Sequence, residues 1–288
     1  MTAPPLRLAT RGSRQALGQA NVVADAVRTA TDRDVELVLV ETTGDARVDV
    51  PLHSSGGQGV CGKEVQRSVR DGRADFAVHS AKDLPSQTEE GLVLAAFTER
   101  RDANDVLVGA TLDALKEGAT VASGSVRRRA QLHAVRPDLQ FVELRGNIDT
   151  RLTKIPDGGA IVMALAALQI LDLTERIDEV LDLERFVPAV GQGCVAVECR
   201  DGDADTLSAL AAVDHVDTRR RVEIERAFLA ELGSGCSLPV AGHVIGTDLH
   251  TFLAAPDRGV SVSEVVDVSH DGLAVGRSAA KRAQERLG

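Results

Sequence analysis

The residues best suited to chemistry follow a short apolar run at 76–78 and read HSAKD at positions 79–83. Within this motif, Lys82 and Asp83 place an ammonium group beside a carboxylate, which can move protons or meet a charged intermediate. The alternative is a structural salt bridge that caps a strand. Because Pro85 cannot donate to a strand ladder, we expect the strand to end before the motif and the polar residues to lie in a loop. The carboxyl ends of strands in open α/β sheets are where ligands are held.

Three further segments place arginines where a predicted strand leads into a predicted helix. They are ATRGSRQAL with Arg11 and Ser13, ASGSVRRRAQL with Ser125, Arg127, Arg128 and Arg129, and ELRGNIDTRL with Arg145 and Arg151. Backbone N–H groups at a helix N-terminus favour anions, and guanidinium groups suit carboxylates and phosphates. In a chain of net charge −10, several such sites indicate a ligand with several negative charges. The alternative at each site is an arginine that is solvated or paired with a nearby acid.

Cys236 differs from the other cysteines in its surroundings, because GSGCSLP places it between small residues. A thiol on an exposed turn suits covalent attachment. Cys194 and Cys199 lie in an apolar segment and are expected in the core. The context of Cys61 does not decide its role. The four cysteines form no CxxC pair, so we expect no metal site. We expect them to be free thiols in a reducing cytoplasm.

Composition and motifs exclude several classes of protein. An excess of 43 acidic over 33 basic residues argues against a general nucleic-acid binder, and six Phe without Trp or Tyr leave little surface for stacking bases. We expect no membrane span, since no apolar run approaches about 18 residues. We expect no signal peptide, because the N-terminus MTAPPLRLATRG lacks a charged region followed by an apolar one. A G-x-S-x-G elbow and a Walker motif are absent, which argues against a Ser-His-Asp triad and a nucleotide site.

Strand and helix patterns alternate along most of the 288 residues, which predicts an α/β protein with mainly parallel, doubly wound sheets and helices on both faces. We expect strands at 6–10, 35–41, 76–78, 92–97, 105–108, 120–122, 141–144 and 160–163, and helices at 14–28, 64–70 and 126–135. The pattern then changes to a helix at 216–232, β-rich runs between 240 and 268, and a helix at 273–287. This last part predicts a third, smaller α/β domain.

The ordered motifs LATRGSRQALGQA, AVHSAKDLP, SGSVRRRAQL, LRGNIDTRL, PAVGQGCVAVECR and ERAFLAELGSGCSLPV closely resemble the hydroxymethylbilane synthase (porphobilinogen deaminase) family over nearly the whole chain. The resemblance implies three domains, of which the first two are like a type II periplasmic-binding-protein pair. The corresponding boundaries are 1–98 plus 190–212 for domain 1, 99–189 for domain 2 and 213–288 for domain 3.

The resemblance also implies roles for the matched residues. Cys236 would carry a covalent dipyrromethane cofactor through a thioether, and Asp83 would be the catalytic carboxylate. The other implied cofactor-binding residues are Lys82, Ser125, Arg127, Arg128 and Arg151, and the implied substrate-binding residues are Arg11, Ser13, Arg145 and Gln192. These cationic groups would bind acetate and propionate side chains, because every pyrrole brings two carboxylates.

The implied function is a transferase of porphyrin and heme biosynthesis. It would join four porphobilinogen molecules head to tail, with release of ammonia, to give the linear tetrapyrrole hydroxymethylbilane. The expected enzyme is a cytoplasmic monomer whose partner is this small-molecule substrate, without nucleic acid or membrane. The alternative is a divergent member that has little or no turnover and binds pyrroles or small anions.

Four features of the sequence depart from the family pattern, and two of them, Cys61 and Ile170, leave room for that alternative. Cys61 stands where the family usually has Phe, and Ile170 stands where it usually has a substrate-binding Arg. The usual Asp-Pro-Arg-Asp reads DAND at 102–105, and the chain stops soon after its last predicted helix. Losing one arginine would remove a charge-assisted hydrogen bond, worth about 1.5–3 kcal/mol.

Overall fold

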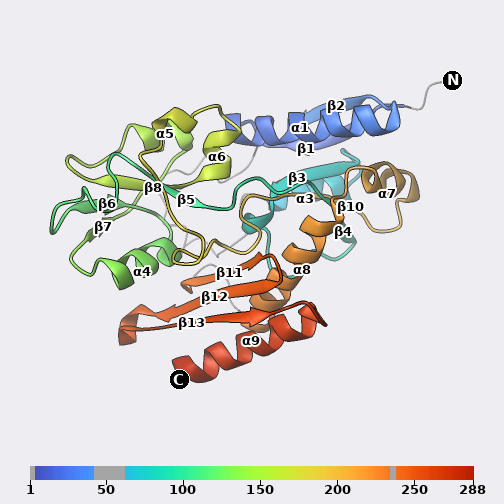
Figure 1. The fold of residues 1–288 in the computed structure, drawn as a ribbon. Helices are drawn as coiled ribbons and strands as arrows, with labels where there is room; N and C mark the ends of the chain where they lie inside the picture. Colours follow the sequence, from blue (N-terminus) through green and yellow to red (C-terminus); the bar gives the residue numbers. More distant parts are fainter. Residues whose placement is uncertain (1–3, 42–61, 234–237) are drawn as a thin grey trace. The chain divides into compact units, whose positions relative to one another are not determined.

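The computed structural model describes residues 4–41, 62–233 and 238–288. The chain divides into two compact units, Met1–Arg101 with Cys194–Arg220 and Asp102–Gly193 with Arg221–Gly288. The described residues form three sheets with helices against them (Figure 1). The predicted α/β class with a smaller third domain is therefore confirmed, while the three domain boundaries stay a prediction.

The sheet of the first unit has the strand order β2-β1-β3-β10-β4. Its strands are β1 (Leu6–Thr10), β2 (Val35–Leu39), β3 (Phe76–Ser80), β4 (Leu92–Phe97) and β10 (Val195–Arg200). Its helices are α1 (Arg14–Thr31), α3 (Lys63–Arg70), α7 (Ala204–Ala211) and the short 3-10 helix η2 (Ala81–Asp83). Strand β10 runs antiparallel to both β3 and β4, whereas the pairs β1–β2 and β1–β3 are parallel. Four of the five strands therefore run in one direction, as predicted.

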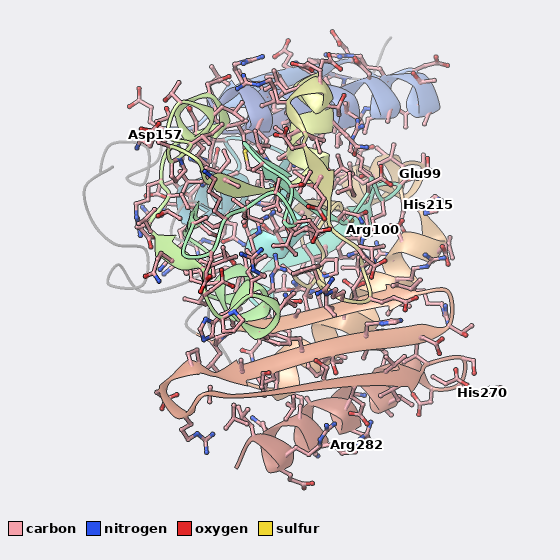
Figure 2. The ribbon with its side chains drawn as sticks, turned by 60° about the vertical axis from the view of Figure 1, so that its left-hand side comes forward. Glu99, Arg100, Asp157, His215, His270 and Arg282 are labelled. Atoms are coloured by element: carbon pink, nitrogen blue, oxygen red, sulfur yellow. The ribbon has the colours of Figure 1, made fainter. Side chains whose placement is uncertain are left out.

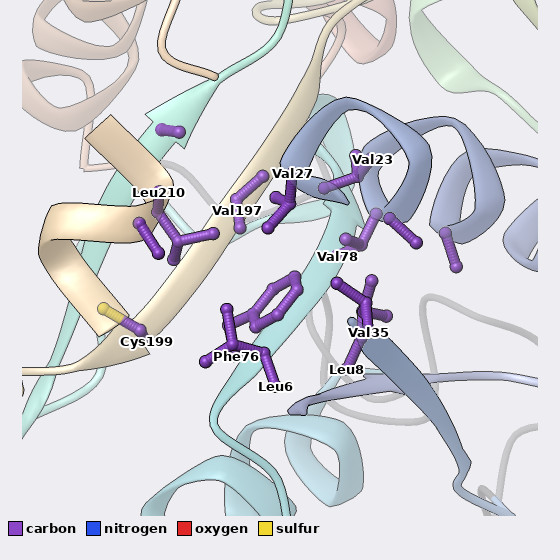
Figure 3. Close-up of a cluster of buried hydrophobic side chains, with 14 residues drawn as sticks. Leu6, Leu8, Val23, Val27, Val35, Phe76, Val78, Val197, Cys199 and Leu210 are labelled. Carbon is purple, nitrogen blue, oxygen red and sulfur yellow. The ribbon is translucent and has the colours of Figure 1, made fainter. Parts of the chain in front are cut away.

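Both faces of this sheet are buried, because alternate residues of each strand enter different clusters. Leu8 and Phe76 pack with α1 and α7 in the cluster drawn in Figure 3, which also contains Cys199. Their neighbours Ala9 and Ala77 pack against α3 on the other side. The sheet is thus held between helices on its two faces, and the predicted core position of Cys199 is confirmed.

The expected end of the third strand, at residue 78, is wrong. Strand β3 continues through His79 and Ser80, which pair with Ala196 and Val195 of β10. The antiparallel ladder with a strand more than a hundred residues later in the chain keeps these two polar residues extended. The turn begins only at Ala81, and the structure therefore separates His79 and Ser80 from the Lys82–Asp83 turn.

The second sheet repeats this arrangement, with the strand order β7-β6-β8-β5-β9. Its strands are β5 (Asp105–Val108), β6 (Thr120–Ala122), β7 (Gln140–Val142), β8 (Ala160–Ala164) and β9 (Glu179–Val180). Its helices are α4 (Val126–Val135), α5 (Ile148–Leu152), α6 (Leu165–Gln169) and η3 (Thr174–Arg176). Strand β5 takes the position that β10 has in the first sheet, antiparallel to both of its neighbours. In each of the two sheets, a strand that follows a crossing of the chain between the units is therefore the antiparallel one.

The third sheet has the order β11-β12-β13 and belongs to the second unit. Its strands are β11 (Val240–Ile245), β12 (Asp248–Ala255) and β13 (Val260–Asp267). The helices of this part of the chain are α8 (Val216–Glu231), η4 (Pro256–Arg258) and α9 (Gly272–Leu287). Ile224, Phe228 and Leu232 share one face of the α8 segment and pack with α9, as their spacing predicts. Val187 packs against Ala241 and Phe252, which joins the third sheet to the segment after β9.

The segment after β4 is fixed within the first unit by the start of α8. The Arg100 N–H donates to Thr218 Oγ1 at 3.2 Å, and His215 Nδ1 lies 2.9 Å from the same oxygen; Arg100 and His215 are labelled in Figure 2. The His215 N–H donates to Phe97 O at 2.8 Å. These bonds position the chain where it leaves the first sheet.

Candidate active site

The carboxyl end of β1 leads directly into the capped start of α1. The Ala16 N–H donates to Ser13 Oγ at 3.3 Å, which makes Ser13 the predicted N-cap, and Thr10 Oγ1 donates to Ala16 O at 3.3 Å. Arg11 lies between these two residues and is half-buried. It therefore sits beside the N-terminus of an 18-residue helix, where the helix dipole favours anions.

The predicted catalytic carboxylate lies on the turn that follows β3. The Ala81 N–H donates to Cys194 O at 3.0 Å and the Leu84 N–H donates to Ala81 O at 3.3 Å, so both ends of η2 are anchored. Leu84 is buried and fixes the exit of the turn. Asp83 is exposed on this anchored turn and Lys82 is half-buried. A carboxylate held at a fixed place but open to a ligand suits a group that stabilises developing positive charge.

His79 has a different environment from Asp83. Its Nε2 lies 3.1 Å from Oε2 of Glu198, and Gln66 Nε2 donates to both oxygens of the same carboxylate at 3.1 Å. All three side chains are buried between β3, β10 and α3. This cluster connects β3 and β10 to α3, so His79 has a structural role within the HSAKD motif.

Arg127 and Arg128 lie in the first turn of α4 and are both buried against Asp105. Ser125 caps this helix, because its Oγ accepts from the Arg128 N–H at 3.4 Å. Arg127 NH1 lies 2.8 Å from Asp105 Oδ2, while Nε and NH2 of Arg128 donate to Asp105 Oδ1 at 3.0 and 2.8 Å. The exposed fractions are 5% for Arg127, 9% for Arg128 and 1% for Asp105. Two guanidinium groups and one carboxylate leave one net positive charge in this cluster.

The charges of the Asp105 cluster depend on one another. Burial alone would raise the pKa of Asp105, but Arg127 and Arg128 outweigh it and hold that pKa well below the ordinary aspartate value. Burial also lowers the pKa of Arg127, against the attraction of Asp105. Because the depression of the Asp105 pKa is large, its carboxylate stays ionised at neutral pH and fixes both guanidinium groups.

Gln192 joins the same cluster. Its Nε2 donates to Asp105 Oδ1 at 2.8 Å and to Ala103 O at 2.7 Å, and its side chain is buried. The structure therefore brings together the sequence-predicted residues Arg127, Arg128 and Gln192. The residue that gathers them, Asp105, was missed as a site residue in the sequence.

Arg145 and Arg151 lie after β7 and are half-buried. Arg145 Nε lies 3.5 Å from Glu143 Oε1, and Arg151 Nε donates to Gly146 O at 2.8 Å. Gly146 has φ +113°, and a Cβ there would lie 2.8 Å from the Thr150 side chain, so this tight turn requires glycine. Asn147 caps α5 through the Thr150 N–H at 2.9 Å. The turn and the cap together hold Arg151 one turn into the helix, as predicted.

Ile170, which stands at the family's arginine position, follows α6 and is half-buried. It packs against the apolar cluster that includes Leu165 and Leu168. Its side chain therefore has a structural role in the second unit. Cys61 and Cys236, the two cysteines whose roles matter most, lie outside the described residues.

The described residues contain no cluster of three or more His, Cys, Asp or Glu side chains that could hold a metal ion. Within the same described ranges, no helix combines the length and apolar character that crossing a membrane requires. The described strand ends instead carry charged and hydrogen-bonding side chains, among them the exposed Asp83 and several arginines. These features define an α/β protein with a polar site at the carboxyl ends of its strands, where open α/β sheets hold ligands.

Comparison with known proteins identifies the family of this chain. Residues 6–208 match the model described as "Porphobilinogen deaminase, dipyromethane cofactor binding domain", and residues 219–285 match "Porphobilinogen deaminase, C-terminal domain". The chain belongs to the porphobilinogen deaminase family, and the predicted resemblance is confirmed.

Two porphobilinogen deaminases agree with this assignment. A porphobilinogen deaminase of Nitratidesulfovibrio vulgaris is 49% identical over 249 residues, which cover 84% of this chain and 79% of the relative. One of Brevibacillus brevis is 41% identical over 281 residues, covering 94% and 91%. Among solved structures, the methionine binding protein MetQ is 13% identical with a TM-score of 0.46, covering 75% of this chain and 92% of its own.

Proposed function

We propose that this chain is a transferase that joins porphobilinogen molecules into the linear tetrapyrrole hydroxymethylbilane. Family membership supports the reaction, and the observation in the structure that carries it is the exposed Asp83 on an anchored turn at the end of β3. No observation favours the alternative of a binding protein without turnover. We also propose the three domain boundaries given above, a monomeric state and a cytoplasmic location.

The reaction requires a group that stabilises positive charge on the pyrroles. In each condensation the C–N bond of the aminomethyl group breaks and ammonia leaves. A C–C bond then forms to a pyrrole α-carbon, which loses its proton, and positive charge passes through pyrrole nitrogens. The carboxylate of Asp83 would stabilise that charge, and Lys82 beside it would bind an acidic side chain of the ligand.

The hydrogen-bond donors of the described strand ends are of the kind that a dipyrromethane cofactor needs. Such a ligand carries several carboxylates, and arginines at strand ends supply planar donors for them. Arg145 and Arg151 are partly exposed and are the candidates for direct contact in the second unit. Arg11 and Ser13 have the same position after β1. When bound through Cys236, dipyrromethane supplies the free α-carbon at which the first bond forms.

The roles of Arg127, Arg128 and Gln192 follow from the Asp105 cluster. Their side chains are buried on Asp105, so we propose that they set the positive charge and the shape at the start of α4 and that Ser125 completes this surface. A guanidinium group has five N–H donors, so each arginine keeps donors beyond those that Asp105 accepts. Direct contact of these arginines with the cofactor stays a prediction.

The test is turnover by the purified protein. Incubation with porphobilinogen should release ammonia and give a linear tetrapyrrole, with one ammonia for each substrate consumed. Asp83→Asn should abolish most of this reaction, while Asp71→Asn, an exposed aspartate after α3, should leave it unchanged. Binding of porphobilinogen without release of ammonia by the wild-type protein would favour the alternative function.

A further inference from the structure

A further buried carboxylate, Glu225 of α8, accepts hydrogen bonds from backbone N–H groups of two distant segments. Its Oε2 accepts from the Gly191 N–H at 2.8 Å. Its Oε1 accepts from the Val244 N–H at 2.9 Å and lies 3.1 Å from Nδ1 of His243. Glu225 has an exposed fraction of 0%. A buried carboxylate with several short donors is strongly constrained, because each N–H would otherwise be unsatisfied.

The contact with Gly191 leads directly to the Asp105 cluster. Gly191 has φ +71°, and the Gln192 N–H donates to Ala189 O at 2.9 Å, which closes a tight turn. The next side chain in this turn is Gln192, which donates to Asp105 Oδ1 at 2.8 Å. Glu225 on one side and Asp105 on the other therefore fix a single dipeptide between two buried anions.

The other end of this network lies in the third sheet, where Glu225 contacts Val244 and His243 of β11. Apolar packing between Val187 and Ala241 joins the same parts of the second unit. One buried carboxylate therefore connects α8, β11 and the turn at Gly191.

We infer that Glu225 is a positioning residue that holds the Gly191 turn so that Gln192 stays on Asp105 and, through it, the Arg127–Arg128 pair keeps its place. This inference deepens the proposed function and rests on it, because it assigns the network to the binding of the acidic ligand. Glu225 is buried and has no direct part in the bond-forming step. It acts through Gly191 and Gln192, and its loss should weaken substrate binding while the charge of Asp83 remains available.

The test compares Glu225→Gln with Gln192→Met and with the double variant. An amide has one acceptor oxygen, so the side chain introduced by Glu225→Gln cannot satisfy both the Gly191 and the Val244 N–H groups. We expect the KM for porphobilinogen to rise about tenfold in each single variant, the change that corresponds to losing one hydrogen bond to a charged group, with kcat within about twofold. Since both changes break the same connection, the double variant should resemble the single variant with the larger effect.

A matched control is Thr251→Val on β12, which removes the hydrogen bond from Oγ1 of the buried Thr251 to Glu264 O at 3.1 Å within the third sheet. It should lower stability and leave KM unchanged. If Glu225→Gln lowers stability but leaves KM as in Thr251→Val, or if the effects of Glu225→Gln and Gln192→Met multiply, Glu225 only supports the fold and the inference is wrong. Where Glu225→Gln yields too little folded protein, an unchanged KM in Gln192→Met alone overturns it. A wild-type protein without turnover refutes the proposed function instead.

Discussion

Removing the charge of Asp105 should destabilise the protein more than removing the charge of an exposed ion pair does. In Asp105→Asn, two buried guanidinium groups lose the carboxylate that lies 2.8 Å from each of them. Breaking a buried ion pair by removing one partner costs about 3–5 kcal/mol, because the remaining charge is uncompensated. We therefore expect the free energy of unfolding, measured by urea titration at pH 7, to fall by about 3–5 kcal/mol.

The matched control is Asp138→Asn. Asp138 accepts from Nε and NH2 of Arg136 at 2.8 and 2.7 Å, so its geometry is as good as that of the Asp105 pair, but its pair lies near the surface. Water screens such a pair, and the loss of stability should be much smaller. Equal losses in the two variants would refute the reasoning, because burial would then not be what makes Asp105 costly to neutralise.

The pH dependence of stability gives a second readout on the same variant. Because the pKa of Asp105 is lower in the folded than in the unfolded state, its contribution is complete above the unfolded value of about 4 and is lost as the pH falls through the folded value. The wild-type protein should therefore lose stability progressively below about pH 4. Asp105→Asn should show a shallower loss over this range, and parallel curves for the two proteins would contradict the assigned pKa.

The remaining predictions concern turnover. Asp83→Asn should lower kcat by at least about 100-fold with the cofactor still attached, because the carboxylate that stabilises developing charge is lost; near-normal kcat would remove Asp83 from catalysis. Arg145→Leu and Arg151→Leu should each raise KM without a large fall in melting temperature, and the reverse pattern would make these arginines structural. Ile170→Arg should lower KM at low salt, with an effect that shrinks as salt screens the new charge. An unchanged KM there would mean that Ile170 serves only the apolar cluster it packs against.

The elements and the strand-end positions of the site could be predicted from local patterns. Apolar periodicity gave the strand around Phe76 and the α8 face, and the cap at Ser13 followed from a serine placed just before a helix. These features depend on residues that are close in sequence. The arginines of α4 were also found, because Ser125 and the residues after it form a recognisable start of a helix.

What the sequence did not reveal depends on contacts between distant residues. Strand β3 extends to Ser80 only because β10 pairs with it. Glu198 meets Gln66 across 132 positions, and Asp105 meets Gln192 across 87. An acidic residue beside an apolar strand looks the same in sequence whether it is solvated or buried with arginines. Only the fold shows that the side chains of Arg127, Arg128 and Gln192 bond to the buried Asp105.

A covalent dipyrromethane cofactor on Cys236 would be visible in the intact mass of the purified protein. We expect the wild-type mass to exceed the sequence mass by one dipyrromethane unit, and Cys236→Ala to have the sequence mass alone. Cys199→Ala is the control, since burial raises the pKa of the Cys199 thiol to about 11 and keeps it unreactive. A wild-type protein at its sequence mass, or a mass excess that persists in Cys236→Ala, would show that Cys236 does not carry this cofactor.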